Sequence, residues 1–302
     1  MSSGVRVHTA LEFDPATLRA RKGDTTVSVC LPARNEAETV GEIVTVIREH
    51  LVEGLGLVDE ILVVDDHSTD ATAELARAAG ANVVAASDVL PDHGRGHGKG
   101  EALWKSVFAS SGDIVLWIDA DLRDFDDRFI TGLLGPLLTD TTIGFVKGFY
   151  ERPYEGTVRG GGRVTELVAR PLLTMYFPHL ADIVQPLSGE YGGRREVLEQ
   201  VPFATAYGVE IAMLIDVAAK FGAESMAQVD LGERIHRNRP LHELSPQAAQ
   251  VMQAAMLRCA PALTPERFRM TPPELDAFEI AYSERPPLAT LPEYRTLHPR
   301  LG

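Results

Sequence analysis

An unbroken apolar run leads directly into two carboxylates in the segment Ile114-Val115-Leu116-Trp117-Ile118-Asp119-Ala120-Asp121, which indicates the fold class. A run of large apolar and β-branched residues is typical of a strand that is buried on both faces of a sheet. Residues i and i+2 of an extended chain point the same way, so Asp119 and Asp121 are expected to face one site. The stretch therefore predicts a buried strand with acidic groups just past its carboxyl end.

Outward from this stretch, similar apolar runs alternate with segments of helical periodicity. The expected strands are 26–31, which Pro32 ends, 60–64, 82–86, 113–118 and 143–150, and the expected helices are 38–50, 69–79 and 100–110. Strands that alternate with helices in this way form parallel sheets joined by crossover helices. The predicted fold class is therefore α/β with a mostly parallel central sheet, and Gly80 is expected to end the helix 69–79.

Composition limits the classes of function. The 302 residues include 43 acidic and 29 basic side chains, for a formal net charge of −14. Such a charge argues against non-specific binding to nucleic acid or to an anionic membrane. Two cysteines are too few for a disulfide framework, and no stretch resembles a signal peptide or a membrane span. A cytoplasmic protein is expected.

A second acidic pair follows another apolar run. Asp65 and Asp66 come directly after the expected strand 60–64. Ligands of open α/β sheets bind outside the carboxyl ends of the strands, so the two acidic pairs point to one pocket. A divalent metal on a nucleotide diphosphate would relieve the repulsion between Asp119 and Asp121. The alternatives are an ordinary acidic turn and, at residues 68–70, a helix cap.

Two glycine-containing basic segments are candidate anion sites. The segment 93–100 fails both the P-loop and the G-x-G-x-x-G templates, but Lys99 at a helix start can neutralise a diphosphate. In Gly160-Gly161-Gly162-Arg163-Val164-Thr165, bare backbone N–H groups, a guanidinium and a hydroxyl suit a phosphate or a carboxylate. Two such segments in an acidic chain indicate two anionic substrates, and a linker and a hinge are the alternatives.

Later segments add polar candidates. If residues 234–238 are extended, alternation places Arg234, His236 and Asn238 on one side, and His236 could complete the metal site begun by Asp121. Glu210 lies at the start of an expected helix, 209–221, where it can bind sugar hydroxyls or only compensate the helix dipole.

Changes in composition and periodicity along the chain predict four parts. We expect an N-terminal extension over 1–24, an α/β core over 25–150, an acceptor-side region of the same domain over 151–259 and a proline-rich C-terminal arm over 260–302. The acceptor-side region contains an amphipathic stretch, 164–176, that Pro171 is expected to interrupt, and a strand near 225–231.

Four motifs follow one another along the chain: Pro32-Ala33-Arg34-Asn35-Glu36, Asp65-Asp66, Lys99 and Asp119-Ala120-Asp121. In this order they resemble the motifs of GT-A glycosyltransferases, which have a Rossmann-like fold and use Asp-x-Asp to hold a divalent ion against a nucleotide-sugar diphosphate. The chain is further similar to the glucosyl-3-phosphoglycerate synthases of actinobacteria at 98–104, 160–171, 185–191, 207–210 and 236–240.

The resemblance implies a retaining hexosyltransferase that moves glucose from UDP-glucose to the 2-hydroxyl of 3-phospho-D-glycerate. It implies a homodimer and an Mg²⁺ or Mn²⁺ ion bound by Asp121 and His236. The residues implied to bind the nucleotide sugar are Pro32, Ala33, Arg34, Asn35, Glu36, Asp66, Lys99, Asp119, Ala120, Tyr207, Gly208, Val209, Glu210 and Arg234. Those implied for the acceptor are Gly162, Arg163, Val164, Thr165 and Asn238, and those implied for catalysis are Glu210, Lys99 and Asp121.

Two positions depart from the resemblance. Arg34 and Asp66 stand where the mycobacterial enzymes carry leucine and serine, beside the base and ribose. A mannosyl-3-phosphoglycerate synthase that uses GDP-mannose is therefore an alternative. A polyprenyl-phosphate glycosyltransferase docked through 164–176 and a non-catalytic nucleotide-sugar sensor are more distant ones.

Overall fold

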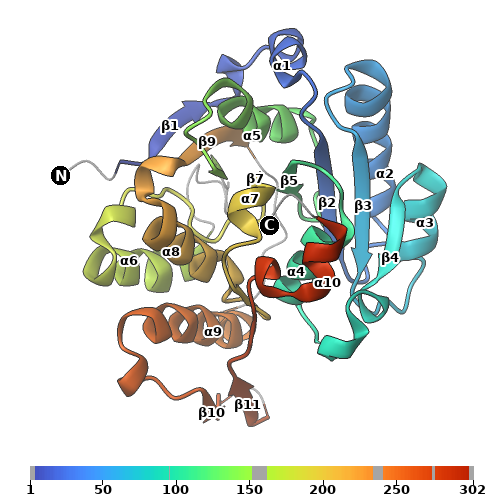
Figure 1. Ribbon diagram of the computed structural model, residues 1–302. Helices are drawn as coiled ribbons and strands as arrows, with labels where there is room; N and C mark the ends of the chain where they lie inside the picture. Colours follow the sequence, from blue (N-terminus) through green and yellow to red (C-terminus); the bar gives the residue numbers. More distant parts are fainter. Residues whose placement is uncertain (1–3, 95, 152–161, 234–240, 274–275, 299–302) are drawn as a thin grey trace.

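An eight-stranded sheet with the order β1-β9-β6-β7-β5-β2-β3-β4 forms the centre of the molecule (Figure 1). The computed structural model describes residues 4–94, 96–151, 162–233, 241–273 and 276–298. The strands are β1 (Arg6–Thr9), β2 (Val27–Ala33), β3 (Glu60–Asp65), β4 (Asn82–Ala85), β5 (Ile114–Trp117), β6 (Phe145–Glu151), β7 (Tyr191–Arg194) and β9 (Met226–Glu233). Only β7 runs antiparallel to its neighbours, β5 and β6. The predicted α/β class with a mostly parallel sheet is confirmed.

Successive residues of each central strand enter two different hydrophobic cores, one on each face of the sheet. Ile114 and Leu116 of β5 pack in the core that includes residues of α1 (Pro15–Lys22), α2 (Val40–Val46), α3 (Thr72–Ala79) and α5 (Arg128–Thr139). Val115 and Trp117 pack in the core with α4 (Lys99–Ala109) and α8 (Val209–Phe221). Because both faces of β5 are buried, the run 114–118 is apolar without a break.

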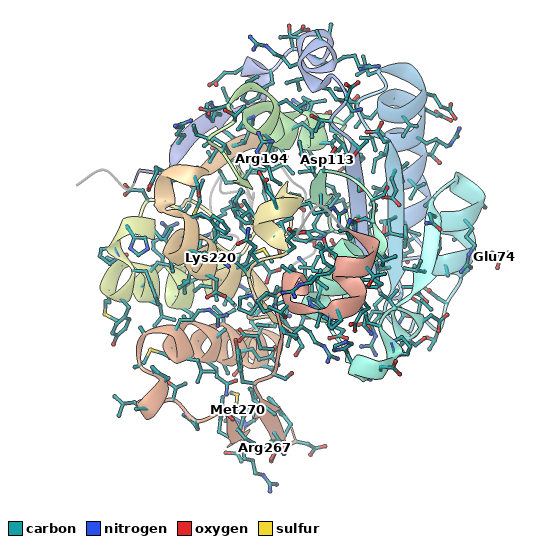
Figure 2. All side chains as sticks on the ribbon, viewed as in Figure 1. Glu74, Asp113, Arg194, Lys220, Arg267 and Met270 are labelled. Atoms are coloured by element: carbon teal, nitrogen blue, oxygen red, sulfur yellow. The ribbon has the colours of Figure 1, made fainter. Side chains whose placement is uncertain are left out.

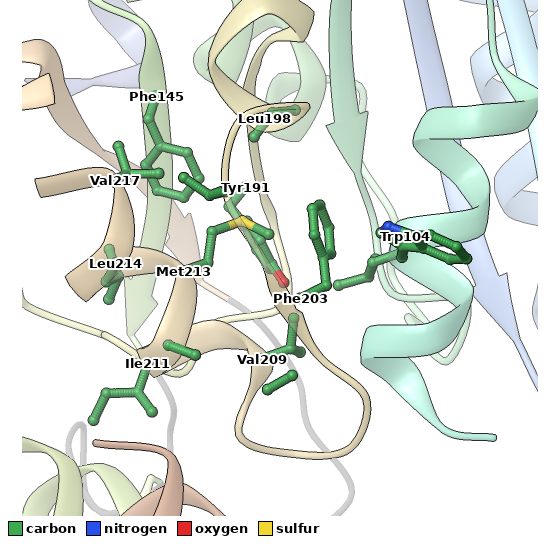
Figure 3. Packing of buried hydrophobic residues seen from close by; sticks show 14 of the residues in the cluster. Trp104, Phe145, Tyr191, Leu198, Phe203, Val209, Ile211, Met213, Leu214 and Val217 are labelled. Atoms are coloured by element: carbon green, nitrogen blue, oxygen red, sulfur yellow. The ribbon is translucent and has the colours of Figure 1, made fainter. Parts of the chain in front are cut away.

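The second core is rich in aromatic residues around Tyr191 (Figure 3). The ring of Tyr191 lies 5.0 Å from that of Trp117 and 6.0 Å from that of Phe145, centroid to centroid. Phe203 of β8 (Phe203–Ala204) meets Trp117 edge-on. Residues of α4, α8 and β8 pack in this one core, so the three elements lie on the same face of the sheet.

Two proline positions depart from expectation. Pro32 lies inside β2 and does not end the strand. Its nitrogen is on the side of β2 that faces β5, but the pairing of β2 with β5 already ends at Cys30 and Trp117. The missing N–H of Pro32 therefore removes no hydrogen bond between strands. The stretch around Pro171 is not interrupted, because a π-helical segment (Thr165–Ala169) leads directly into α6 (Arg170–Tyr176). Its wider turn accommodates Pro171, the second residue of α6.

Several helix bounds also differ from expectation. The helix expected over 38–50 is α2 followed by a π-helical segment (Ile47–Gly54), and α3 begins at Thr72 rather than at Thr69. Gly80 ends α3 with a φ of 106°, as predicted. The predicted bounds of α8 are confirmed.

The first and last described elements, β1 and α10, lie next to the central layers (Figure 1). Residues of the N-terminal 24 supply β1, which pairs with β9 at one edge of the sheet. After α9 (Leu241–Cys259), β10 (Arg267–Met270) and β11 (Phe278–Ala281) form a hairpin, seen at the bottom of Figure 2. The chain then returns to the body through β12 (Glu284–Arg285) and α10 (Pro292–Leu297), where Tyr294 is buried. No helix of the described ranges is long and apolar enough to cross a membrane.

Candidate active site

The carboxyl ends of β2, β3 and β5 meet at one edge of the sheet because these strands are mutually parallel. The loop after β2 is tied to the loop after β3 through Asn35, which has a φ of 57°. Its backbone N–H donates to Ser68 Oγ at 3.0 Å, and its Oδ1 accepts from the Thr69 N–H at 2.8 Å. The structure thus joins the predicted nucleotide residues 32–36 to the segment that follows Asp66.

Asp66 connects these loops to the basic segment before α4. Its side chain is buried, and its Oδ2 accepts from the Gly98 N–H at 2.9 Å. Gly98 has a φ of 95°, and a Cβ there would lie 3.0 Å from the Thr205 carbonyl oxygen. A glycine at this position therefore lets the chain pass Asp66 and begin α4 at Lys99.

Lys99 forms the centre of the site. Its Nζ lies 2.7 Å from Asp119 Oδ1 and 2.9 Å from Glu210 Oε1. Burial alone would lower the pKa of Lys99, but Asp119 and Glu210 outweigh it and raise that pKa well above its usual range. Lys99 is therefore a fixed cation, and the three groups share a net negative charge.

Asp119 is held by a close backbone approach. A Cβ at Gly189 would lie within 1.9 Å of Asp119 Oδ2, so only glycine leaves room for this carboxylate. The neighbouring Ala120 carbonyl accepts from Thr39 Oγ1. Because β5 ends at Trp117 and residues 120–121 lie in a turn, strand alternation does not extend to Asp121. That Asp119 and Asp121 face one site stays a prediction. Asp121 is exposed in a turn, whereas Asp119 is half-buried.

The predicted metal pair is only partly within the described residues. Asp121 is described, but His236, Arg234 and Asn238 lie outside the described residues. Within the described ranges, another group could hold a metal: one ligand atom each from Asp66, His67 and His97 lie within 4.8 Å of one another. Sequence analysis missed this group, although both histidines flank residues that it had singled out.

The predicted acceptor segment lies at the start of a helix. Gly162 has a φ of 82°, and its carbonyl accepts from the Glu166 N–H at 3.0 Å. Arg163 and Val164 are half-buried and Thr165 is buried. Gly160 and Gly161 lie outside the described residues. Arg163, Val164 and Thr165 thus directly follow a glycine with a positive φ, a conformation found in anion-binding backbone turns.

Residues 207–210 lead into α8 and place Glu210 toward Lys99. The Tyr207 N–H donates to Gln250 Oε1 at 3.2 Å, and a Cβ at Gly208 would lie 2.6 Å from that of Ala254. Val209 and Glu210 are buried, whereas Tyr207 is 44% exposed. The segment is therefore anchored to α9 on one side, with Glu210 in the interior on the other.

Sequence analysis missed a buried lysine beside this site. Lys147 of β6 is the cross-strand partner of Tyr191, and its Nζ lies 3.8 Å from the centre of that ring. It also donates to the Ser188 carbonyl at 2.8 Å. Tyr191 Oη is buried and has no hydrogen-bond partner among the described residues. One signal was available, because Lys147 stands alone inside the apolar run 143–150.

Lys147 predicts a pH dependence of stability. Burial lowers the pKa of Lys147 to about 7 in the folded chain, whereas an unfolded lysine titrates near about 10.4. Between these values the unfolded chain binds more protons, so the free energy of unfolding rises with pH. We expect the wild type to gain about 2 kcal/mol relative to Lys147→Met between pH 7 and pH 9, measured by urea unfolding.

The exposed Lys220 provides the control (Figure 2). Lys220→Met is expected to follow the wild-type pH profile. Parallel profiles for the wild type and Lys147→Met would contradict the prediction.

Comparison with known proteins places this geometry in a family. Glycosyl transferase family 2 matches residues 28–201. The glucosyl-3-phosphoglycerate synthase of Petrotoga mobilis is 46% identical over 290 residues, which span 91% of this chain and 89% of the relative. The match therefore covers more of the chain than the family region 28–201.

Two crystal structures are similar over almost the whole chain. Glucosyl-3-phosphoglycerate synthase from Mycobacterium tuberculosis, in complex with Mn²⁺, UDP-glucose and phosphoglyceric acid, has a TM-score of 0.83 at 45% identity and covers 91% of this chain and 94% of that chain. Mannosyl-3-phosphoglycerate synthase from Rubrobacter xylanophilus has a TM-score of 0.84 at 42% identity, with coverages of 94% and 96%. The chain therefore has the predicted GT-A fold and belongs to glycosyl transferase family 2, within the group of the glucosyl-3-phosphoglycerate synthases.

Proposed function

We propose that the protein moves glucose from UDP-glucose to the 2-hydroxyl of 3-phospho-D-glycerate with retention of configuration. The observation that carries this proposal is the position of Lys99 between Asp119 and Glu210, at the sheet edge where nucleotides bind in α/β folds. The relative solved with UDP-glucose and phosphoglyceric acid supports the same pair of substrates.

The nucleotide would lie over the joined loops 32–36 and 66–70, with its diphosphate toward Lys99. During transfer the bond from sugar C1 to the diphosphate oxygen breaks, and a bond from C1 to the acceptor 2-oxygen forms on the same face. The proton of the acceptor hydroxyl passes to the departing phosphate oxygen. The Lys99 ammonium stabilises the negative charge that develops on the leaving diphosphate. Glu210 orients Lys99 and the sugar.

An Mg²⁺ or Mn²⁺ ion fits the charge of this site. The trio of Lys99, Asp119 and Glu210 has an excess of carboxylate, and Asp121 adds an exposed carboxylate beyond β5. Hard divalent ions take carboxylate and phosphate oxygens together. Asp121 and His236 would hold the ion, which supplies further charge neutralisation of the diphosphate when bound.

The acceptor phosphoglycerate would lie against the start of the helix that contains Arg163. Gly162, Val164 and Thr165 offer backbone N–H groups and a hydroxyl there, and Asn238 completes the proposed set. Arg234 is proposed to contact the nucleotide sugar.

Donor competition tests the proposal. Equal concentrations of UDP-glucose and GDP-mannose, with 3-phosphoglycerate and metal, should give glucosyl-3-phosphoglycerate as the main product by mass spectrometry. A mannosyl product in excess would favour the alternative that the similarity to the Rubrobacter xylanophilus enzyme supports and that Arg34 and Asp66 raised.

The proposal includes the assembly and location of the enzyme. We propose a cytoplasmic homodimer that acts without membrane or nucleic acid. Light scattering of the purified chain tests the dimer, and a monomer across the micromolar range would refute it.

A further inference from the structure

The C-terminal segment reaches the chain on either side of Lys99. β12 pairs antiparallel with β8, with Arg285 opposite Phe203. The residue after β8, Thr205, accepts the Glu101 N–H at 3.2 Å and donates its own N–H to the Ser283 carbonyl at 3.1 Å. The first turn of α4 is therefore hydrogen-bonded to the residue after β8, and β8 is in turn paired with β12 of the C-terminal segment.

Gly100 makes this close contact between α4 and β8 possible. A Cβ at Gly100, the residue after Lys99, would lie 1.7 Å from the Ala204 carbonyl oxygen. The backbone of α4 thus lies directly against β8, with no side chain between them. Because no flexible side chain separates the two backbones, a shift of β8 would also move Lys99.

Arg285 adds a direct connection. Its Nε donates to Glu101 Oε2 at 2.6 Å and its Nη2 to Glu101 Oε1 at 2.9 Å, a two-pronged pair with a fully buried carboxylate. Its Nη1 donates to the His93 carbonyl at 2.5 Å. One guanidinium therefore holds two points that flank Lys99, one six residues before it and one two residues after it.

Neighbouring contacts fix the guanidinium itself. It lies 5.4 Å from the centre of the Trp104 ring, and Trp104 Nε1 donates to the Pro286 carbonyl at 2.9 Å. Lys105 Nζ lies 3.1 Å from Glu101 Oε1, so a second cation neutralises Glu101. The charge of Glu101 thus does not depend on Arg285 alone, and the particular contribution of Arg285 is its contact with both Glu101 and His93.

We propose that Arg285 is a positioning residue for donor binding: through Glu101 and His93, the C-terminal segment sets the place of Lys99 before the nucleotide diphosphate arrives. This inference rests on the proposed function, because it assumes that Lys99 binds the diphosphate. A site whose cation is already in place loses less conformational freedom when the donor binds.

Steady-state kinetics of Arg285→Gln and Arg285→Lys test the inference. We expect Arg285→Gln to raise the KM for UDP-glucose about tenfold, with kcat within about threefold and the KM for 3-phosphoglycerate within about twofold. Arg285→Lys should recover part of the loss, because an ammonium can hold Glu101 or His93 but lacks the guanidinium fork. The control is Arg267→Gln, an exposed arginine in the hairpin of the same segment (Figure 2), which should match the wild type.

A role in folding alone gives a different pattern. If Arg285 only stabilised the fold, Arg285→Gln would lower the melting temperature and leave both KM values of the folded enzyme unchanged, which would overturn the proposal. An equal rise in both KM values would overturn it as well. If Arg285→Gln does not fold, the KM of Arg285→Lys decides, and a wild-type value for UDP-glucose refutes the inference.

Amide hydrogen exchange separates this inference from the proposed function. In Arg285→Gln the amides of residues 96–101 should exchange about tenfold faster than in the wild type, whatever the substrate is. Unchanged exchange would refute positioning by Arg285. Absence of UDP-glucose turnover by the wild type, with faster exchange in the variant, would refute the proposed function only.

Discussion

Lys99→Ala is expected to lower kcat/KM for UDP-glucose by about 10³-fold, the scale of losing a positioned charge at a leaving group. The change removes the ammonium that lies 2.7 Å from Asp119 and 2.9 Å from Glu210. It also leaves these two carboxylates to repel the incoming diphosphate. Initial rates over a range of UDP-glucose concentrations, at saturating metal and acceptor, measure the effect.

Matched variants isolate the role of this lysine. Lys220→Ala makes the same change at an exposed lysine that contacts the Gln200 carbonyl, and it should retain wild-type kinetics. Lys99→Arg keeps the charge with a different shape and should recover only part of the activity. A loss of less than fivefold in a folded Lys99→Ala enzyme would exclude Lys99 from the reaction.

Glu210→Gln is expected to lower kcat by about 10²-fold and to keep the stereochemistry of the product. The amide oxygen can still accept from Lys99, but the negative charge that fixes the ammonium is lost. The anomeric proton coupling of the product, measured by NMR, reports configuration, and mass spectrometry of the quenched enzyme reports any adduct. Glu74→Gln, at an exposed position on α3, is the control (Figure 2).

The competing mechanism makes Glu210 a nucleophile. A covalent glycosyl adduct trapped on Glu210 of the wild type would establish that mechanism and contradict the positioning role. Wild-type kcat in Glu210→Gln would contradict both roles.

Local patterns were enough to predict the core of the fold. The apolar run 114–118 is unbroken because alternate residues enter different cores, and the bounds of α8 follow from helical periodicity alone. Local patterns failed at Pro32 and Pro171, where the effect of a proline depends on which neighbour the missing N–H would face or on a widened turn. Neither condition can be inferred from adjacent residues.

In the candidate site, too, local sequence patterns predicted some residues and missed others. Lys99 and Asp119 were predictable because each lies at the end of a local element, and the structure brings them into contact. The contact of Arg285 with Glu101 spans 184 residues, so no local pattern could reveal it. Lys147 was missed because a single lysine in an apolar run is informative only once Tyr191 and Ser188 are known to surround it.

Formation of glucosyl-3-phosphoglycerate by the purified protein is the decisive measurement for the proposed reaction. The purified protein is incubated with UDP-glucose and 3-phosphoglycerate, with Mg²⁺ or Mn²⁺ and in parallel with excess chelator, and the products are analysed by NMR. We expect UDP and a glucosyl-3-phosphoglycerate whose anomeric configuration is that of the donor, formed only where metal is present. No product with metal, an equal yield with chelator or a product of inverted configuration would contradict it.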